Sequence, residues 1–244
     1  MSIDRAPQDE EQTSESRVVT GISSMATRHV LNAMSKTYAQ QAGRHVDVVS
    51  VGGVEAARRV RDGEAFDFVV LAADVIDQLA TSGRVDPGSR TDLVRSGIAM
   101  AVAGGAPKPE IGSERAVRDA VQAARAIGYS TGPSGGYVAR LLERWGILDA
   151  NSPRLVQAAP GVPVGALIAS GEVTLGFQQL SELMHVPGID VVGVLPPDIQ
   201  LATVFSGAVC SSCRRPASTK ALLAYFASPT TDEAKRRHGL QPAR

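Results

Sequence analysis

The chain has 244 residues, of which 43% are hydrophobic, and its 25 basic residues balance its 25 acidic residues. A chain of this size buries a full hydrophobic core and forms one large domain or two smaller lobes. Balanced charge without a basic, aromatic-rich patch argues against a nucleic-acid partner, and no apolar run is long enough to span a bilayer.

The first residues are polar and acidic. Residues 1–17 include Asp9, Glu10, Glu11 and Glu15 and contain no apolar core. We therefore expect a disordered tail rather than a secretory signal, and hence a cytoplasmic protein. An ABC permease becomes an expected partner only if an export signal is missing from this sequence.

Three strand–helix units follow one another after this tail. Strands are predicted at Val18–Ile22, His45–Val51 and Phe66–Leu71, and each is followed by an amphipathic helix, the first of which ends at Gly43. Such units in succession predict a parallel sheet covered by helices.

A longer extended run, Leu93–Val102, breaks this rhythm and precedes the helix-breaking segment 104–109. We interpret it as a crossover into a second lobe. The extended segment 200–206 brings the chain back, and helices over 218–226 and 231–237 close the first lobe. The expected organisation is therefore lobe 1 at 18–97 plus 200–244, and lobe 2 at 98–199.

The second lobe repeats the alternation of strands and helices. A strand at 126–130 runs into the Gly-rich turn Thr131–Tyr137, and an amphipathic helix follows to Gly146. A second strand is predicted at 154–158. The apolar run that begins at Gly171 ends in Gln178 and Gln179, before Ser181 and Glu182. Another buried strand is predicted at Ile189–Val194.

Four turns after predicted strand ends carry small or hydroxyl residues and open helices. They are Ser23-Ser24, Gly52-Gly53, Thr131–Gly136 and Gln178–Ser181. A helix start offers unpaired backbone N–H groups and a positive dipole end, so several converging starts form an anion site. The alternative for each turn alone is an ordinary helix start, with Ser181 as a simple N-cap.

Other candidate groups are isolated. His29 and His45 fit solvated positions, whereas His185 follows Glu182 closely and is a possible site residue. Arg95 in the crossover run could clamp a carboxylate or lie on the surface. Glu55 could simply favour the dipole of its helix. The histidines lack paired metal-ligand spacing, so neither a metal nor another cofactor is expected.

The two cysteines, Cys210 and Cys213, form a Cys-x-x-Cys pair. This spacing fits a redox pair or half of a metal site, but no second pair of ligands follows it. Two incidental thiols in a reducing compartment are the simpler interpretation.

The order of these motifs resembles the type II periplasmic-binding-protein fold, and within it the molybdate-binding-protein-like group of substrate-binding proteins. The resemblance runs from Val18 to the end of the chain. It implies an α/β fold of two lobes with mixed sheets covered by helices, two crossover strands, and a small anionic ligand in the cleft. The binding residues that it implies are Ser23, Ser24, Gly52, Gly53, Thr131, Ser134 and Gly135, with Val162, Gln178 and Ser181 less securely placed.

Two functions follow from this resemblance. The first is binding of a small carboxylate or oxyanion. Because the group includes aconitate-isomerase-like members, the alternative is a cofactor-free isomerase or tautomerase that moves a double bond in an unsaturated di- or tricarboxylate by proton transfer. Candidate acid/base residues are then Glu182, Ser24 and Tyr137, with Glu55 and His185 as further options.

Overall fold

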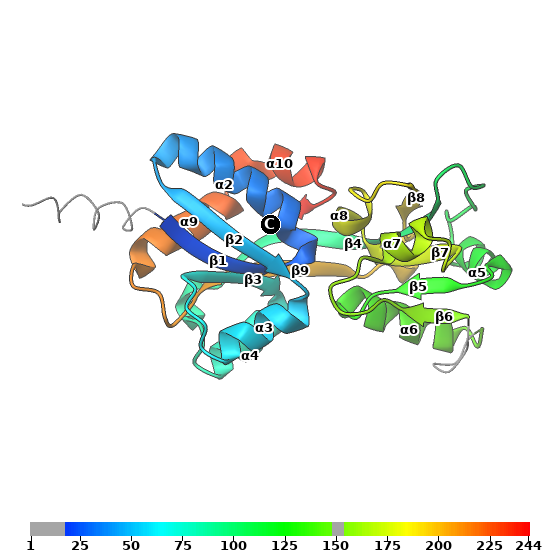
Figure 1. The fold of residues 1–244 in the computed structure, drawn as a ribbon, viewed down its shortest axis with the longest axis horizontal. Helices are drawn as coiled ribbons and strands as arrows, with labels where there is room; N and C mark the ends of the chain where they lie inside the picture. The colour runs from blue at the N-terminus through cyan, green and yellow to red at the C-terminus, as the bar shows by residue number, and fades with distance from the viewer. Residues whose placement is uncertain (1–17, 148–153) are drawn as a thin grey trace, which may run out of the picture.

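A computed structural model describes residues 18–147 and 154–244 of the chain. The predicted tail, 1–17, lies outside the described residues. The predicted two-lobed α/β architecture is confirmed, with β4 and β9 joining the two lobes (Figure 1). None of the helices in the described ranges has the length and apolar composition that a bilayer span requires.

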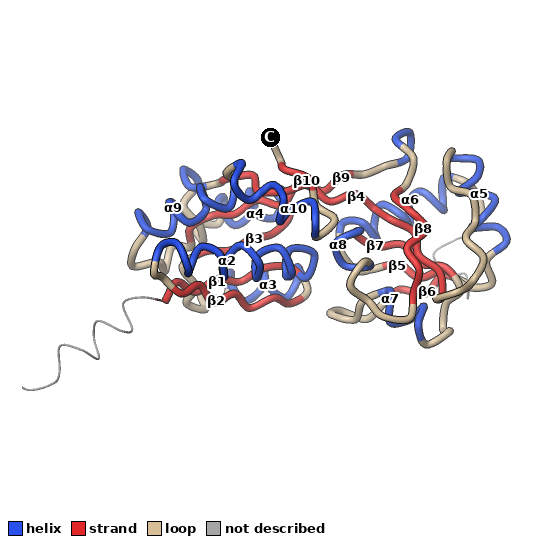
Figure 2. Tube along the Cα trace, turned by 90° about the horizontal axis from the view of Figure 1, so that it is seen from above, coloured by secondary structure: helices blue, strands red, loops and turns tan. Residues whose placement is uncertain are grey.

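The first lobe combines elements from both ends of the chain, as seen from above in Figure 2. Its elements are β1 (Val18–Ser24), η1 (Met25–Thr27), α2 (Arg28–Ala42), β2 (His45–Val51), α3 (Gly53–Arg61), β3 (Phe68–Ala72), α4 (Ala73–Thr81), η2 (Pro87–Ser89), β4 (Thr91–Ala103), β9 (Ala202–Val209), α9 (Pro216–Ala227), η4 (Pro229–Thr231), α10 (Asp232–Arg237) and β10 (Gln241–Pro242).

The second lobe is built from the middle of the chain. Its elements are α5 (Glu114–Ala123), β5 (Ile127–Tyr129), α6 (Pro133–Arg144), β6 (Leu155–Gln157), α7 (Val164–Ala169), β7 (Leu175–Gln179), α8 (Leu180–Leu183), β8 (Ile189–Val194) and η3 (Pro197–Ile199).

One strand belongs to both lobes. The strand order is β2-β1-β3-β9-β4-β7-β5-β6, with β8 and β10 also paired to β4. Residues Thr91–Gly97 of β4 pair antiparallel with β9, whereas Ile98–Val102 pair antiparallel with β7. The strands β1, β2 and β3 are parallel to one another, and so are β5, β6 and β7. The sheets are therefore mixed.

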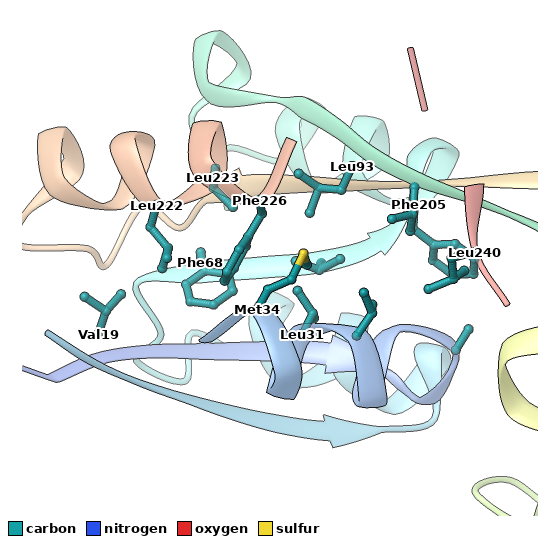
Figure 3. Close-up of a cluster of buried hydrophobic side chains, with 14 of the residues drawn as sticks. Val19, Leu31, Met34, Phe68, Leu93, Phe205, Leu222, Leu223, Phe226 and Leu240 are labelled. Atoms are coloured by element: carbon teal, nitrogen blue, oxygen red, sulfur yellow. The ribbon is translucent and has the colours of Figure 1, made fainter. Parts of the chain in front are cut away.

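The core of the first lobe occupies both faces of its sheet. Successive side chains of a strand point to opposite faces. Phe68 therefore packs with Met34 and Phe226 beneath α2 and α9 (Figure 3). Its neighbour Val69 packs on the other face with residues of α3 and α4, such as Ile76. Burying one such side chain fully stabilises the fold by about 1.5–3 kcal/mol.

Two predictions about strands are wrong. The first strand continues through Ser24 instead of ending at Ile22. The strand Ile189–Val194 is half-buried instead of buried, and its Val194 is 49% exposed. It pairs only with β4, away from the main strand order, so it lacks the two flanking strands that would enclose it.

Candidate functional site

A cavity of about 1140 Å³ lies between the lobes and takes its wall from both of them. The expected ligand-binding residues that line it are Ser24, Gly52, Gly53, Thr131, Ser134, Val162 and Gln178. The expected acid/base residue Glu182 lines it too, as do Glu55 and His185.

Helices of both lobes start at this wall, among them α3 and α6. The nine-residue α3 begins after Gly52, and the twelve-residue α6 begins with Pro133 after Gly132. Their first backbone N–H groups have no partner within the helix, and the helix dipole is positive at this end. The lobes approach closely here, since a Cβ on Gly52 would lie 3.6 Å from the backbone nitrogen of Gly161. The arrangement favours a negatively charged ligand.

Two buried side chains in the wall have polar atoms without a hydrogen-bond partner. They are the Ser24 hydroxyl and the Gln179 carbonyl oxygen Oε1, each in a residue no more than 7% exposed. Unpaired buried polar atoms cost free energy in the absence of a ligand. The Ser24 hydroxyl can donate to an anion, and Gln179 Oε1 can accept from a protonated carboxyl or a hydroxyl.

Glu182 lies half-buried in the wall next to Gln178. Burial raises the pKa of Glu182 to about 7, and a hydrogen bond from the Gln178 side chain partly opposes that rise. The Gln178 carbonyl Oε1 in turn accepts a 2.8 Å hydrogen bond from the backbone N–H of Val164, which fixes the orientation of the amide. Glu182 therefore exchanges a proton near neutral pH, as a general acid or base must.

The second acidic residue in the wall is held in its charged form. Glu55 is paired with Arg58 of the same helix at 2.7 Å, and this hydrogen bond lowers the pKa of Glu55. Glu55 is thus a poor candidate for proton transfer at neutral pH.

Four expected binding residues, Ser23, Ser181, Gly135 and Arg95, do not line the cavity. Ser23 is fully buried with its hydroxyl 2.8 Å from that of Ser50, because the strand alternates and turns Ser23 away from Ser24. Ser181 is the second residue of α8 rather than its N-cap, which is Gln179. Its hydroxyl lies 3.4 Å from that of Ser96 in β4.

Gly135 also stays behind the wall, since a Cβ there would lie 1.7 Å from the carbonyl oxygen of Ser130. Its role is to let the backbone of the turn pack closely.

Arg95 and Tyr137 point elsewhere. The Arg95 guanidinium donates to the carbonyl oxygen of Ala243, so it fastens the end of the chain to β4. The Tyr137 hydroxyl donates to the carbonyl oxygen of Ile199 at 3.1 Å. Neither residue lines the cavity, so we assign neither a clamp role to Arg95 nor proton transfer to Tyr137.

His29, which the sequence favoured as solvated, lies in the cavity wall at the start of α2. Its ring centroid is 4.0 Å from that of His185, which lines the same cavity. His238, at the end of α10, completes the group. These residues are far apart along the chain, so only the fold reveals the cluster. The position of His29 just after the Ser24 turn is the one local signal.

The cysteines lie away from the cavity. Cys210 follows β9. The backbone N–H of Cys213 donates to the carbonyl oxygen of Cys210, which closes a tight turn. Burial raises the pKa of Cys210 to about 12. Within residues 18–147 and 154–244, no group of three or more histidine, cysteine or acidic side chains is placed to hold a metal ion.

Comparison with known proteins places this geometry in context. The chain is 38% identical over 229 residues to an aconitate isomerase from a Pseudomonas species, covering 92% of this chain and 87% of that protein. The periplasmic molybdate-binding protein of Azotobacter vinelandii has a similar fold, with a TM-score of 0.78, 18% identity, and coverage of 93% of this chain and 100% of that one.

A sulfate-binding protein from Mycobacterium tuberculosis H37Rv gives a TM-score of 0.74 at 16% identity, covering 93% of this chain and 87% of that one. The family model described as bacterial extracellular solute-binding protein matches residues 19–241. With its helix starts facing an interlobe cavity, the chain belongs to this family of solute-binding proteins.

Proposed function

We propose that this protein is a cofactor-independent isomerase that moves a carbon–carbon double bond in an unsaturated tricarboxylate, with aconitate as the substrate to test first. The observation that carries the proposal is Glu182, a carboxyl in the wall of an anion-binding cavity whose pKa burial raises to about 7. The relative named aconitate isomerase supports the choice of substrate.

The reaction needs one proton to leave and one to arrive. The Glu182 carboxylate removes a proton from the CH₂ group beside the double bond. The C–H electron pair forms the new double bond, and the pair of the old one binds a proton at the far carbon, returned by Glu182. The composition of the substrate is unchanged. Negative charge develops on the substrate carboxylates, where helix N-termini and the Ser24 hydroxyl stabilise it.

A protein that only binds a fully ionised anion does not need an acidic side chain in its wall. An ionised Glu182 repels a carboxylate ligand, whereas the protonated form does not. A pKa near neutrality gives both forms appreciable populations, which suits a group that takes and returns a proton.

The experiment is incubation with trans-aconitate in deuterated water, followed by proton NMR. We expect cis-aconitate to appear and deuterium to enter the carbon positions that exchange protons. Glu182→Gln is expected to slow both processes by at least about 100-fold, while Glu172→Gln, at an exposed position outside the cavity, leaves them unchanged. Isomerisation that Glu182→Gln leaves intact would contradict the assignment.

The second candidate is binding of a carboxylate or oxyanion without chemistry. The unpartnered Ser24 hydroxyl and the two helix starts favour it equally well. Calorimetry with molybdate, sulfate and tricarballylate, a saturated tricarboxylate, separates the candidates. Binding of these ions by a protein that leaves aconitate unchanged supports the binding function.

The cellular compartment of the protein and its binding to a permease depend on which of the two functions it has. The polar first residues led to the expectation of a cytoplasmic protein, whereas the family description is extracellular. Fractionation of cells that express the tagged full-length protein distinguishes the two. A transport role additionally requires that a membrane permease bind the liganded form, which a pull-down with and without ligand measures.

A further inference from the structure

Three of the four histidines of the chain meet at the edge of the cavity. His29 comes from the start of α2, His185 follows α8, and His238 ends α10. The ring centroid of His185 lies 4.0 Å from that of His29 and 5.2 Å from that of His238. His29 and His185 line the cavity directly, so the cluster joins elements of both lobes at the ligand site.

One hydrogen bond within the cluster links His238 Nδ1 and His185 Nε2 at 3.2 Å. One ring donates a proton in this bond and the other accepts it, so the accepting ring is neutral. This bond does not use the other ring nitrogen of His185, Nδ1, and it orients the two rings relative to each other.

The charged groups that act on these rings are basic. Burial lowers the pKa of His29, and so do the neighbouring His185, Arg28 and His238. Burial also lowers the pKa of His185 and, together with His185, that of His238. Arg28 itself lines the cavity. The cluster therefore presents several basic groups without an acidic partner.

The nearby acidic residues are engaged elsewhere. On α10, Asp232 pairs with Arg244 and Glu233 pairs with Arg237. On α3, Glu55 pairs with Arg58. On α8, Glu182 is hydrogen-bonded to Gln178.

We infer that the His29–His185–His238 cluster is the subsite for one carboxylate of the ligand, and that it takes up a proton when that carboxylate binds. The inference rests on the proposed tricarboxylate ligand. Because His185 follows Glu182 by three residues and both line the cavity, the subsite holds the ligand beside the proton-transferring carboxyl.

The pH dependence follows from the charges. In the free protein, burial and the neighbouring basic groups favour the neutral form of the rings, because they lower the pKa values below the usual 6.5. A bound carboxylate favours the imidazolium form and raises those values. Binding therefore takes up protons, and the affinity increases as the pH falls.

Glu182 also takes up a proton when an anion approaches, so the test uses the Glu182→Gln protein as background. Calorimetry with tricarballylate at pH 6, in buffers of different ionisation enthalpy, measures the number of protons taken up. We expect uptake of a substantial fraction of one proton per ligand. Adding His185→Gln abolishes the uptake and weakens binding at least tenfold, whereas adding His45→Gln, an exposed residue of β2, changes neither.

NMR of the imidazole nitrogens provides a measurement on the unmutated chain. Tricarballylate is expected to raise the pKa values of the cluster. Binding without proton uptake and without these shifts overturns the subsite and leaves the isomerase proposal standing. Uptake in a protein that leaves aconitate unchanged supports the subsite and overturns the isomerase. Absence of tricarballylate binding overturns the subsite, whereas the isomerase proposal is decided by the aconitate assay.

Discussion

Glu182 makes the stability of the protein depend on pH. Burial raises its pKa from 4.5 to about 7, so the folded state keeps a proton that the unfolded chain has lost. The stabilisation from this residue is present below pH 4.5 and lost as the pH rises through 7. Since one pKa unit corresponds to about 1.36 kcal/mol, the change amounts to at most about 3 kcal/mol.

Replacing Glu182 by glutamine removes this dependence, because the amide resembles the protonated carboxyl at every pH. We expect the free energy of unfolding of the variant, relative to that of the wild type, to be higher at pH 8 than at pH 5. Urea unfolding at both pH values measures the difference. An equal change in the free energy of unfolding at both would contradict the raised pKa.

The adjacent glycines of α6 provide a matched pair for the turn that borders the cavity. In Gly135→Ala the new methyl group meets the Ser130 carbonyl oxygen at 1.7 Å, and the turn must move. We expect a loss of about 1–3 kcal/mol or more and weaker ligand binding.

In Gly136→Ala the nearest atom, a terminal nitrogen of Arg140, is 3.6 Å away. Because alanine favours a helix over glycine by up to about 1 kcal/mol, this variant should be as stable as the wild type or more so. Thermal unfolding and calorimetry compare the two. Equal behaviour of the variants would contradict the close packing at Gly135.

At the scale of residues, local order was enough to predict several residues of the cavity wall. Gly52 follows a strand end in the first lobe, Thr131 and Glu182 follow strand ends in the second, and all three line the cavity. Whether Ser23 or Ser24 faces the cavity depends on where the first strand ends, and strand propensity does not define that position. The histidine cluster depends on packing between distant segments, which no local pattern reports.

At the scale of elements, Gln200 fastens the return segment to β4. Its Oε1 accepts a 2.7 Å hydrogen bond from the backbone N–H of Ile98, and its Nε2 donates to the carbonyl oxygens of Ile98 and Leu195 at 3.0 and 3.1 Å. These contacts lie where β4 changes its partner from β9 to β7. The amide thus adds to the backbone hydrogen bond that the Ile98 carbonyl oxygen already accepts from the N–H of Leu195.

Gln200→Ala removes the acceptor of the Ile98 N–H and the donor to the Leu195 carbonyl oxygen. We expect a loss of about 1–3 kcal/mol in the free energy of unfolding. Gln157→Ala, at an exposed position of β6, serves as the control and should change stability by less than about 0.5 kcal/mol. Urea denaturation of both proteins measures the effect. A Gln200→Ala protein as stable as the control would show that water replaces the amide.

The strand–helix units were predictable because each has its own hydrophobic period and turn residues, such as the left-handed Gly43 that ends α2. The half-buried character of β8 was not predictable, because the apolar composition of this strand resembles that of a buried strand. Burial there depends on sheet order, which one sequence does not specify. Likewise, Ser181 resembles an N-cap, but the helix begins one residue before it.

At the scale of the molecule, a ligand between the lobes couples binding to unfolding. A ligand that binds only the folded protein, at 100 times its dissociation constant, stabilises it by about 2.7 kcal/mol. For a chain of this size we expect a rise of about 5–10 °C in the melting temperature. Tricarballylate should produce it, and its uncharged triamide should not. Equal shifts from both compounds would contradict recognition of the carboxylates.

The position of β9 has a consequence for biosynthesis. This strand lies between β3 and β4 in the first sheet, although it begins only at Ala202. A growing chain therefore leaves the ribosome with the centre of its N-terminal lobe missing. The later lobe, whose strands β4 to β7 are contiguous along the chain, has its strands available first. The first lobe to be translated is thus the last to be completed, and its unpaired β3 edge needs protection until β9 arrives.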